Sequence, residues 1–320
     1  MTDTHTVTAK HQFRPLEELN LLDNFLFETL LLQEGDGEEF CRILLSTILG
    51  RPIRKVKIVP QKNVPGIDTN QHGICMDAYI EDISDMECMP GVNAADATVS
   101  SDIYDIEPNK RYERISLPKR MRYYHGLIDT QLLASGTDYS KLKNVIIIII
   151  LPYDPFGKNR MVYTISNHCE EDASIPYDDG AKKIFLYTKG TEGTPSKSLS
   201  DMLKYIEKTT DDNVTNQDID TIHHFVVKAK HRKEVGINYM KTWERERLCR
   251  EEGFAEGREE GLAEGREEGL AEGREAGVLA LIRTCQEFHA SREETLAKII
   301  RNFTLTSEDA NACLEKYWQE

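Results

Sequence analysis

The sequence predicts an α/β protein with a core built on a mixed β-sheet and an α-helical C-terminal extension. The main indication is the order of segments, because a helix, three strands, a helix and a further strand follow one another before residue 199. The run VIIIIIL at 145–151 is apolar throughout, as in a strand buried on both faces, and it is far too short to span a bilayer. From about residue 199 the pattern is helical to the end.

Helices are expected at three places in the core. Apolar residues at helical spacing predict a helix over 16–32, and a Gly-Asp-Gly break at 35–37 separates it from a second helix over 38–49. A later helix over 116–136 has Pro118 in its first turn and a glycine at its end, where these residues usually occur.

Five strands are expected in the core, and the segment 182–188 adds one more. The stretch GICMDAYIED alternates apolar and polar side chains, which predicts a strand with one buried face. A polar connection over about 82–100 leads from this strand to the next. The expected strands are 56–59, 73–82, 101–110, 145–151, 160–166 and 182–188.

Charge and cysteine content indicate which partners and which cellular compartment to expect. The formal net charge is −15, from 40 basic and 55 acidic side chains, which argues against a surface uniformly coated in positive charge. Nucleic acid is still a permitted partner, because local basic patches matter more than the sum. The first residues lack an apolar core, so no signal peptide is expected, and no membrane partner is indicated. Seven cysteines without paired spacing indicate reduced thiols in a cytoplasmic protein.

The C-terminal region contains an internal repeat. AEGREEGL occurs at 255–262 and again at 263–270, and AEGREAGV follows at 271–278. Glycine at every fourth position weakens the helix, because each costs about 1 kcal/mol relative to alanine. Two interpretations stay open: a solvated helical spacer, or close helix–helix packing, as in a coiled coil, that makes the protein a homo-oligomer.

The expected domain organisation follows from these shifts in pattern. A helical hairpin is expected at the C-terminus because Ser291 and Glu294 have the spacing of a capping box. The expected parts are a disordered N-terminus (1–15), the α/β core (16–198), a helical extension packed on the core (199–243), the repeat (244–278) and the C-terminal helical hairpin (279–320).

Two carboxylates in the expected strands point to chemistry. Asp77 lies in the middle of GICMDAYIED and Glu107 ends the strand in SDIYDIEPNK, although carboxylates are poor strand residues and are costly to bury unpaired. If the two strands pair, both acids converge, and the backbone carbonyl of Ile106 adds a third oxygen ligand. Such oxygens suit Mg²⁺ or Mn²⁺, which can activate a water molecule against a phosphodiester.

Another interpretation of these acids is structural. Asp105 and Glu107 would then face solvent at the edge of the sheet, with Pro108 as the signal of an edge strand. Asp105 shares a strand face with Glu107, about 6.6 Å away at the Cα atoms. Asp105 either supports the metal site through hydrogen bonds to the groups around the metal or is simply exposed, and we expect it to be exposed.

In their order, several segments resemble the PD-(D/E)XK nucleases, and more closely the transposase-like branch of Rpn-type recombination-promoting nucleases. The segments that carry the resemblance are DNFLF, GICMDAYIED, IYDIEPN, LPKRMRYYHGLID, LPYDPFG and the tail rich in glutamate and glycine. The resemblance implies a restriction-endonuclease-like αβββαβ core. It also implies metal-dependent cleavage of DNA, in recombination, mobile-element or defence contexts.

The resemblance assigns roles to individual residues. Asp77 and Glu107 match the two metal-binding acids. Asn109 stands two places after Glu107, where the superfamily has Lys and close relatives often have Gln, so it departs from the pattern. Asn can hydrogen-bond a water molecule but has no positive charge, and Lys110 is its candidate substitute. On the first helix, the acids that could approach the metal are Asp23 and Glu28. The alternative for Asp23 is a packing or hydrogen-bonding role at the start of the helix.

Basic residues lie close to these acids in the sequence. Lys119, Arg120 and Arg122 belong to the expected helix after Glu107, and we expect them to bind DNA phosphates. The alternative is a catalytically degenerate relative that binds DNA or a protein partner and assembles through its helical tail.

Overall fold

The computed structural model describes residues 13–66, 72–83 and 102–318. Most of the connection expected at 82–100, and residues 1–12 of the expected disordered N-terminus, lie outside this part of the chain. The chain divides into two units, residues 1–241 and 242–320.

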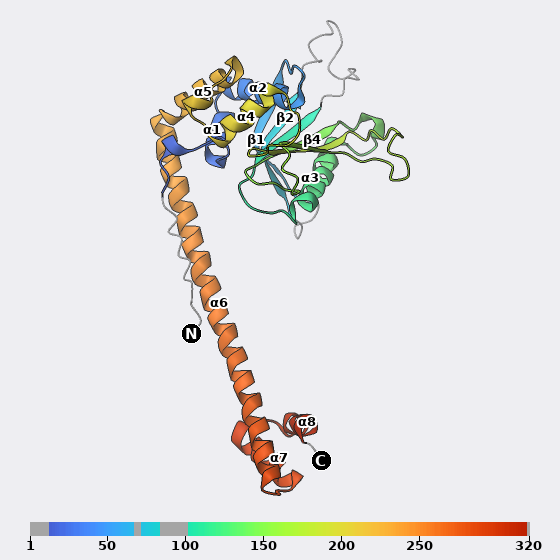
Figure 1. The fold of residues 1–320 in the computed structure, drawn as a ribbon, viewed down its shortest axis with the longest axis vertical. Helices are drawn as coiled ribbons and strands as arrows, with labels where there is room; N and C mark the ends of the chain where they lie inside the picture. The colour runs from blue at the N-terminus through green and yellow to red at the C-terminus, as the bar shows by residue number, and fades with distance from the viewer. Residues whose placement is uncertain (1–12, 67–71, 84–101, 319–320) are drawn as a thin grey trace. The chain divides into compact units, whose positions relative to one another are not determined.

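A mixed six-stranded sheet lies at the centre of the first unit (Figure 1), which confirms the predicted α/β class. The strand order is β1-β2-β3-β4-β6-β5. The first three strands pair antiparallel, β3, β4 and β6 pair parallel, and β5 runs antiparallel to β6. The strands are β1 (Val56–Val64), β2 (Ile74–Asp82), β3 (Ile103–Pro108), β4 (Val145–Leu151), β5 (Val162–Ile165) and β6 (Ala181–Tyr187).

Helices cover both faces of the sheet, which explains the isoleucine run. Ile146, Ile148 and Ile150 of β4 belong to one core cluster, and Ile147 and Ile149 belong to another on the opposite face. The first cluster includes residues of α1 (Asn24–Leu31), α2 (Asp36–Leu49), α4 (Lys197–Glu207) and α5 (Gln217–Lys230), and the second those of α3 (Leu117–Leu132). Because β4 is covered on both sides, every one of its side chains is buried.

The helix expected over 16–32 is divided in two, so this prediction is wrong in its first half. A short 3-10 helix, η1 (Leu16–Glu18), precedes α1, and the chain between them turns. The hydroxyl of Thr209 accepts a hydrogen bond from the backbone N–H of Leu21 at 2.9 Å, and the backbone N–H of Thr209 donates to Asn20 Oδ1 at 3.1 Å. A contact from a distant part of the chain therefore overrides the local helical pattern. Two further 3-10 helices are η2 (Tyr139–Lys141) and η3 (Asp211–Asn213).

The second unit is helical. The long helix α6 (Lys233–Glu287) begins in the first unit and is followed by α7 (Arg292–Phe303) and α8 (Ser307–Tyr317). The capping box expected at Ser291 and Glu294 is present at the start of α7. The end of α6 packs with α7 and α8 around a small apolar cluster, whose buried members are Val278, Ile282, Ile299, Ala310 and Leu314.

The repeat lies on the exposed part of α6. Every residue from Glu251 to Glu275 is exposed, and the hydrophobic side chains of Phe254, Leu262 and Leu270 are among them. Within the described ranges, no helix is both long and apolar enough to cross a membrane.

Candidate active site

The register between β2 and β3 brings the two predicted acids together. Ala78 lies opposite Ile106, and this is the last pair of the antiparallel ladder. Asp77 and Glu107 are each the next residue beyond that pair, so their backbones face each other at the same end of the two strands. The Asp77 charge also raises the pKa of Glu107, which agrees with this placement.

The strand that carries Glu107 is an interior strand. β3 pairs with β2 on one side and with β4 on the other, where Glu107 lies opposite Ile149. The backbone N–H of Asn109 continues this pairing by donating to the carbonyl of Ile150 at 2.8 Å. The interpretation of Pro108 as the signal of a sheet edge is therefore wrong.

Asp105 is buried, although it was expected to be exposed. Its side chain is 0% exposed, and Glu107 is 6% exposed. Asp105 lies opposite Tyr79 and Ile147, which both belong to the core cluster under α3, so the helix covers this face of the sheet. The expectation that Asp105 faces solvent is wrong because it assumed an edge strand.

The three carboxyl groups form one electrostatic cluster. Burial is the main cause that raises the pKa of Glu107 to about 8, against the opposing charge of Arg120. Burial also raises the pKa of Asp105 well above its ordinary value, and the charges of Glu107 and Asp77 add to this. The pKa of Asp77 is raised by burial and lowered by the hydrogen bond from Gln61. Three ionised acids at this position require a compensating positive charge.

Arg120 of α3 supplies part of that charge. Its Nη2 lies 3.5 Å from Glu107 Oε2, and its Nη1 donates to Glu113 Oε2 at 2.6 Å. Its guanidinium carbon lies 5.7 Å from the ring centroid of Tyr124 on the same helix. Arg120 is thus a partner of the acids, a role that the phosphate assignment from sequence did not include.

Further groups approach the cluster from β1, β2 and α1. Gln61 Nε2 donates to Asp77 Oδ1 at 3.3 Å, and the thiol of Cys75 donates to Gln61 Oε1 at 3.1 Å. Burial raises the pKa of Cys75, and the charges that add to it are those of Asp77, Glu28, Glu107 and Asp105. The predicted Glu28 of α1 therefore lies within electrostatic range of this end of the sheet.

Unpaired polar atoms concentrate at this position. Seven buried side-chain nitrogen or oxygen atoms in the described segments lack a hydrogen-bond partner. Four of the seven belong to β3, the residue after it and α3: both oxygens of Asp105, Nδ2 of Asn109 and Nε of Arg120. Buried polar atoms are nearly always paired in folded proteins, so these two acceptors and two donors are available to a ligand or to water.

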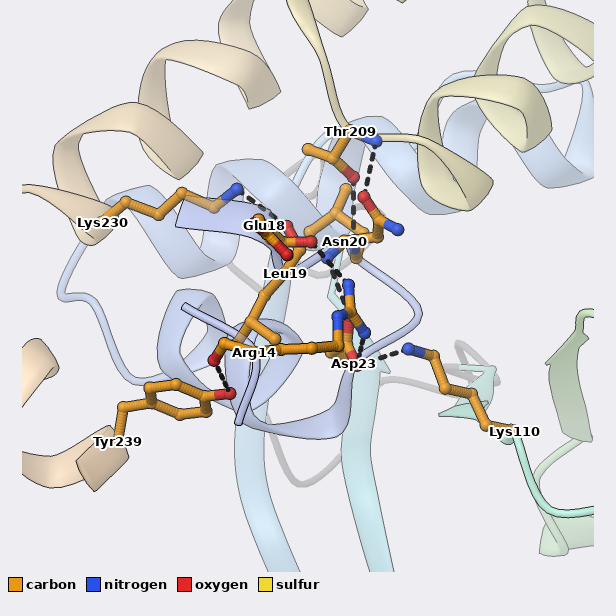
Figure 2. A network of polar contacts seen from close by, with 10 residues as sticks. Arg14, Glu18, Leu19, Asn20, Asp23, Lys110, Thr209, Lys230 and Tyr239 are labelled. Carbon is orange, nitrogen blue, oxygen red and sulfur yellow. Dashed lines mark hydrogen bonds and ion pairs between the residues drawn. The ribbon is translucent and has the colours of Figure 1, made fainter. Parts of the chain in front are cut away.

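Lys110 and Asp23 are both residues that the resemblance associates with the metal site. They form an ion pair with each other (Figure 2). The Lys110 ammonium forms an ion pair with Asp23 Oδ1, and Arg14 Nη1 lies 3.2 Å from the same oxygen. The other Asp23 oxygen accepts a hydrogen bond from the backbone N–H of Asn20 at 2.8 Å. Asp23 thus joins the start of α1 to the segment after β3. Its carboxylate is occupied by protein partners.

The other predicted phosphate-binding residues lie on the surface of α3. Lys119 and Arg122 are exposed, whereas Arg120 is partly buried by its ion pairs. The three basic residues therefore divide into one that faces the acids and two that are available to an external anion.

The residues at the end of the β2–β3 ladder fit a divalent cation that retains several water ligands, such as Mg²⁺. No three His, Cys, Asp or Glu side chains in the described ranges form a ready-made metal cluster. Two carboxylates and a backbone carbonyl form a smaller set, and Mg²⁺ commonly binds with one or two carboxylates and several waters. Asp77 and Glu107 would supply the carboxylates of that set, and the Ile106 carbonyl is the backbone oxygen expected from the sequence.

The sequence places Asp105 on the same strand face as Glu107, but it does not show that this face is buried under α3. Gln61 carried no signal in the sequence, because its contact with Asp77 depends on strand pairing. Comparisons of this chain with models of protein families, with curated proteins and with solved structures found no match.

Proposed function

We propose that this protein is a Mg²⁺- or Mn²⁺-dependent deoxyribonuclease with the restriction-endonuclease-like core of the PD-(D/E)XK class. One observation carries the proposal: the β2–β3 register brings Asp77 and Glu107 together, and Arg120, which pairs with Glu107, keeps an unpaired Nε donor. Carboxylate oxygens suit a divalent cation, and N–H donors suit the oxygens of a phosphate. A cation bound next to a phosphodiester satisfies both sets at once.

The proposed cation ligands are Asp77, Glu107 and the carbonyl of Ile106. A divalent cation supplies polarisation of the phosphodiester and a water molecule of lowered pKa. Asp77 and Glu107 hold the negative charge that attracts it, and Arg120 limits the repulsion between the acids while the site is empty of substrate.

Asn109 and Arg120 position the phosphate in this proposal. The side-chain oxygen of Asn109 accepts a hydrogen bond from the backbone N–H of Arg111 at 2.9 Å, which orients the amide and leaves its Nδ2 for a ligand. Both terminal nitrogens of Arg120 pair with acids, so its Nε is the group left for a phosphate oxygen. Lys119 and Arg122 add sequence-independent contacts to the DNA backbone.

The resemblance to Rpn-type nucleases is the support for DNA as the substrate. The ordered segments around Asp77 and Glu107 carry it, and a role in recombination, mobile elements or defence is proposed on the same basis. A cytoplasmic location is part of this proposal.

The first prediction tests the cation site through cleavage. Asp77→Asn and Glu107→Gln should each reduce Mg²⁺- or Mn²⁺-dependent nicking of supercoiled plasmid to below about 1% of wild type, because each removes one of two charged ligands. Asp129→Asn is the matched control: this acid lies on α3, and the charges that shift its pKa are those of Asp179 and Lys183. Wild-type activity in either site variant would refute the assignment.

A binding protein without catalysis is the second candidate. The observation that favours it is the pairing of Lys110 with Asp23, together with the uncharged Asn109 at the position of the usual lysine. Such a protein would bind DNA in a salt-dependent manner and cleave none with either cation. The same plasmid assay, run beside a DNA-binding measurement, separates the two.

A further inference from the structure

Asp105 is the buried acid that the proposed cation ligands do not include. It is 0% exposed and neither carboxylate oxygen has a hydrogen-bond partner among the described residues. Leaving a buried charge or polar group unpaired costs several kcal/mol in typical cases, so folded proteins rarely keep one without a use.

The polar neighbours of Asp105 form no hydrogen bond with it. Tyr79 lies opposite it in the sheet, but the Tyr79 hydroxyl donates to Glu81 Oε1 at 3.2 Å. The terminal nitrogens of Arg120 pair with Glu107 and Glu113. A protonated Asp105 would carry an O–H that still needs an acceptor, and no described side chain or backbone group accepts from it. The missing partner therefore comes from outside this part of the protein.

The position of Asp105 indicates what that partner is. In the sheet, Asp105 pairs with Tyr79 of β2, two places along from Asp77. It lies on the same face of β3 as Glu107, one alternate position deeper in the sheet. The three acids do not converge as a ready-made cluster of direct ligands, however. With few protein ligands, Mg²⁺ and Mn²⁺ retain bound water molecules, and a carboxylate in this place can accept hydrogen bonds from them.

We propose that Asp105 is a positioning residue of the cation site, which accepts hydrogen bonds from water carried by the cation between Asp77 and Glu107. The proposal rests on the proposed function, because it requires a cation at those two acids. Carboxylates that hydrogen-bond to the groups around a metal typically contribute about 10- to 100-fold in metal affinity. The negative charge and the two oxygens of Asp105 both serve this purpose.

Direct titration of the full-length protein with MnCl₂ tests the proposal without using activity. The free Mn²⁺ signal in electron paramagnetic resonance gives the dissociation constant for wild type, Asp105→Asn, Asp77→Asn and the control Asp129→Asn. We expect Asp105→Asn to bind Mn²⁺ about 10- to 100-fold more weakly, since asparagine keeps the shape but loses the charge. The control should bind as wild type does.

Thermal unfolding with and without MnCl₂ separates this role from a structural one. Asp105→Asn replaces a buried, unpaired carboxyl group with an amide of the same shape, so its metal-free form should melt close to wild type, while the increase in melting temperature on adding MnCl₂ should shrink. A merely structural role would shift both melting curves equally. If the asparagine variant does not fold, Asp105→Thr makes the same test with a residue suited to strands.

The outcomes distinguish the two proposals. Weakened binding in Asp105→Asn beside an unchanged control supports the role of Asp105. Wild-type affinity in Asp105→Asn, with binding lost in Asp77→Asn, overturns it and leaves the proposed function intact. Absence of Mn²⁺ binding by the wild-type protein overturns both.

Discussion

At the scale of single residues, His125 shows how burial sets a charge state on α3, the helix that also carries Arg120. Its ring is 6% exposed on α3, and the Nε2–H donates to the carbonyl of Lys182 at 3.2 Å. The other ring nitrogen, Nδ1, has no partner within the described segments. Burial, and then the charge of Lys183, lower the pKa of His125 from 6.5 to about 4. The folded protein therefore holds His125 neutral.

This charge state predicts an acid-dependent loss of stability. Between pH 6.5 and about 4 the unfolded chain binds a proton at His125 and the folded chain does not. The free energy of unfolding is therefore unaffected by this group above pH 6.5 and falls as the pH drops, by up to about 3 kcal/mol. Urea unfolding of His125→Gln should show a shallower pH dependence over this range, whereas the exposed His224→Gln should match wild type. Identical slopes in all three proteins would contradict the prediction.

At the scale of elements, the glycines of α6 have two different environments. A Cβ atom added at Gly261 would meet no described atom within 4 Å. At Gly277 it would lie 2.8 Å from Cε1 of Phe303, because the end of α6 packs against α7. The first glycine is a helix position without a packing role, and the second makes room for an aromatic ring.

Alanine substitution should therefore act differently at the two glycines. Gly261→Ala should stabilise the helix by up to about 1 kcal/mol, because alanine has the higher helix propensity. Gly277→Ala displaces the Phe303 ring and should lose that gain or lower stability. Helical circular dichroism during thermal unfolding of the full chain measures both, each acting as the control of the other. Equal stabilisation would show that Phe303 moves aside without cost.

At the scale of the whole molecule, the core of the first unit needs the beginning of α6. Its buried cluster extends to Tyr239, whose hydroxyl donates to the carbonyl of Arg14 at 2.7 Å and whose ring centroid lies 5.0 Å from that of Phe25. Truncation after Lys241 keeps these contacts, and truncation after Arg232 removes them. We expect the longer fragment to fold with wild-type Mn²⁺ affinity and the shorter one to melt several degrees lower. Failure of the longer fragment to fold would place the domain boundary elsewhere.

Self-association is expected to depend on the second unit. Phe254, Leu262 and Leu270 are exposed by 74%, 64% and 65% along the repeat, and a contact between copies would bury them. Sedimentation of the full chain and of residues 1–241 should give an oligomer and a monomer, respectively. Changing the three residues to glutamine should convert the full chain to a monomer as well. A full chain that is monomeric at high concentration would make the repeat a spacer.

The sequence by itself determined most of the elements and the two acids beside the last pair of the β2–β3 ladder. The isoleucine run, the alternation in 73–82 and the helical spacing after 199 are local patterns, and each reports which faces of its own segment are buried. Asp77 and Glu107 were found in the same way, as carboxylates inside such patterns. Local periodicity is enough for these predictions, because a segment with one buried face carries apolar residues at regular intervals along its own sequence.

Only the tertiary structure decided which residues meet. β3 is interior because β4 pairs with it after a helical crossover, and this buries Asp105. Thr209 bonds to the chain before α1, so the helix predicted over 16–32 begins later, and Asp23 pairs with Lys110; both features arise from contacts between distant parts of the chain. Such contacts depend on the positions of two segments in space, and no periodicity within either segment encodes them.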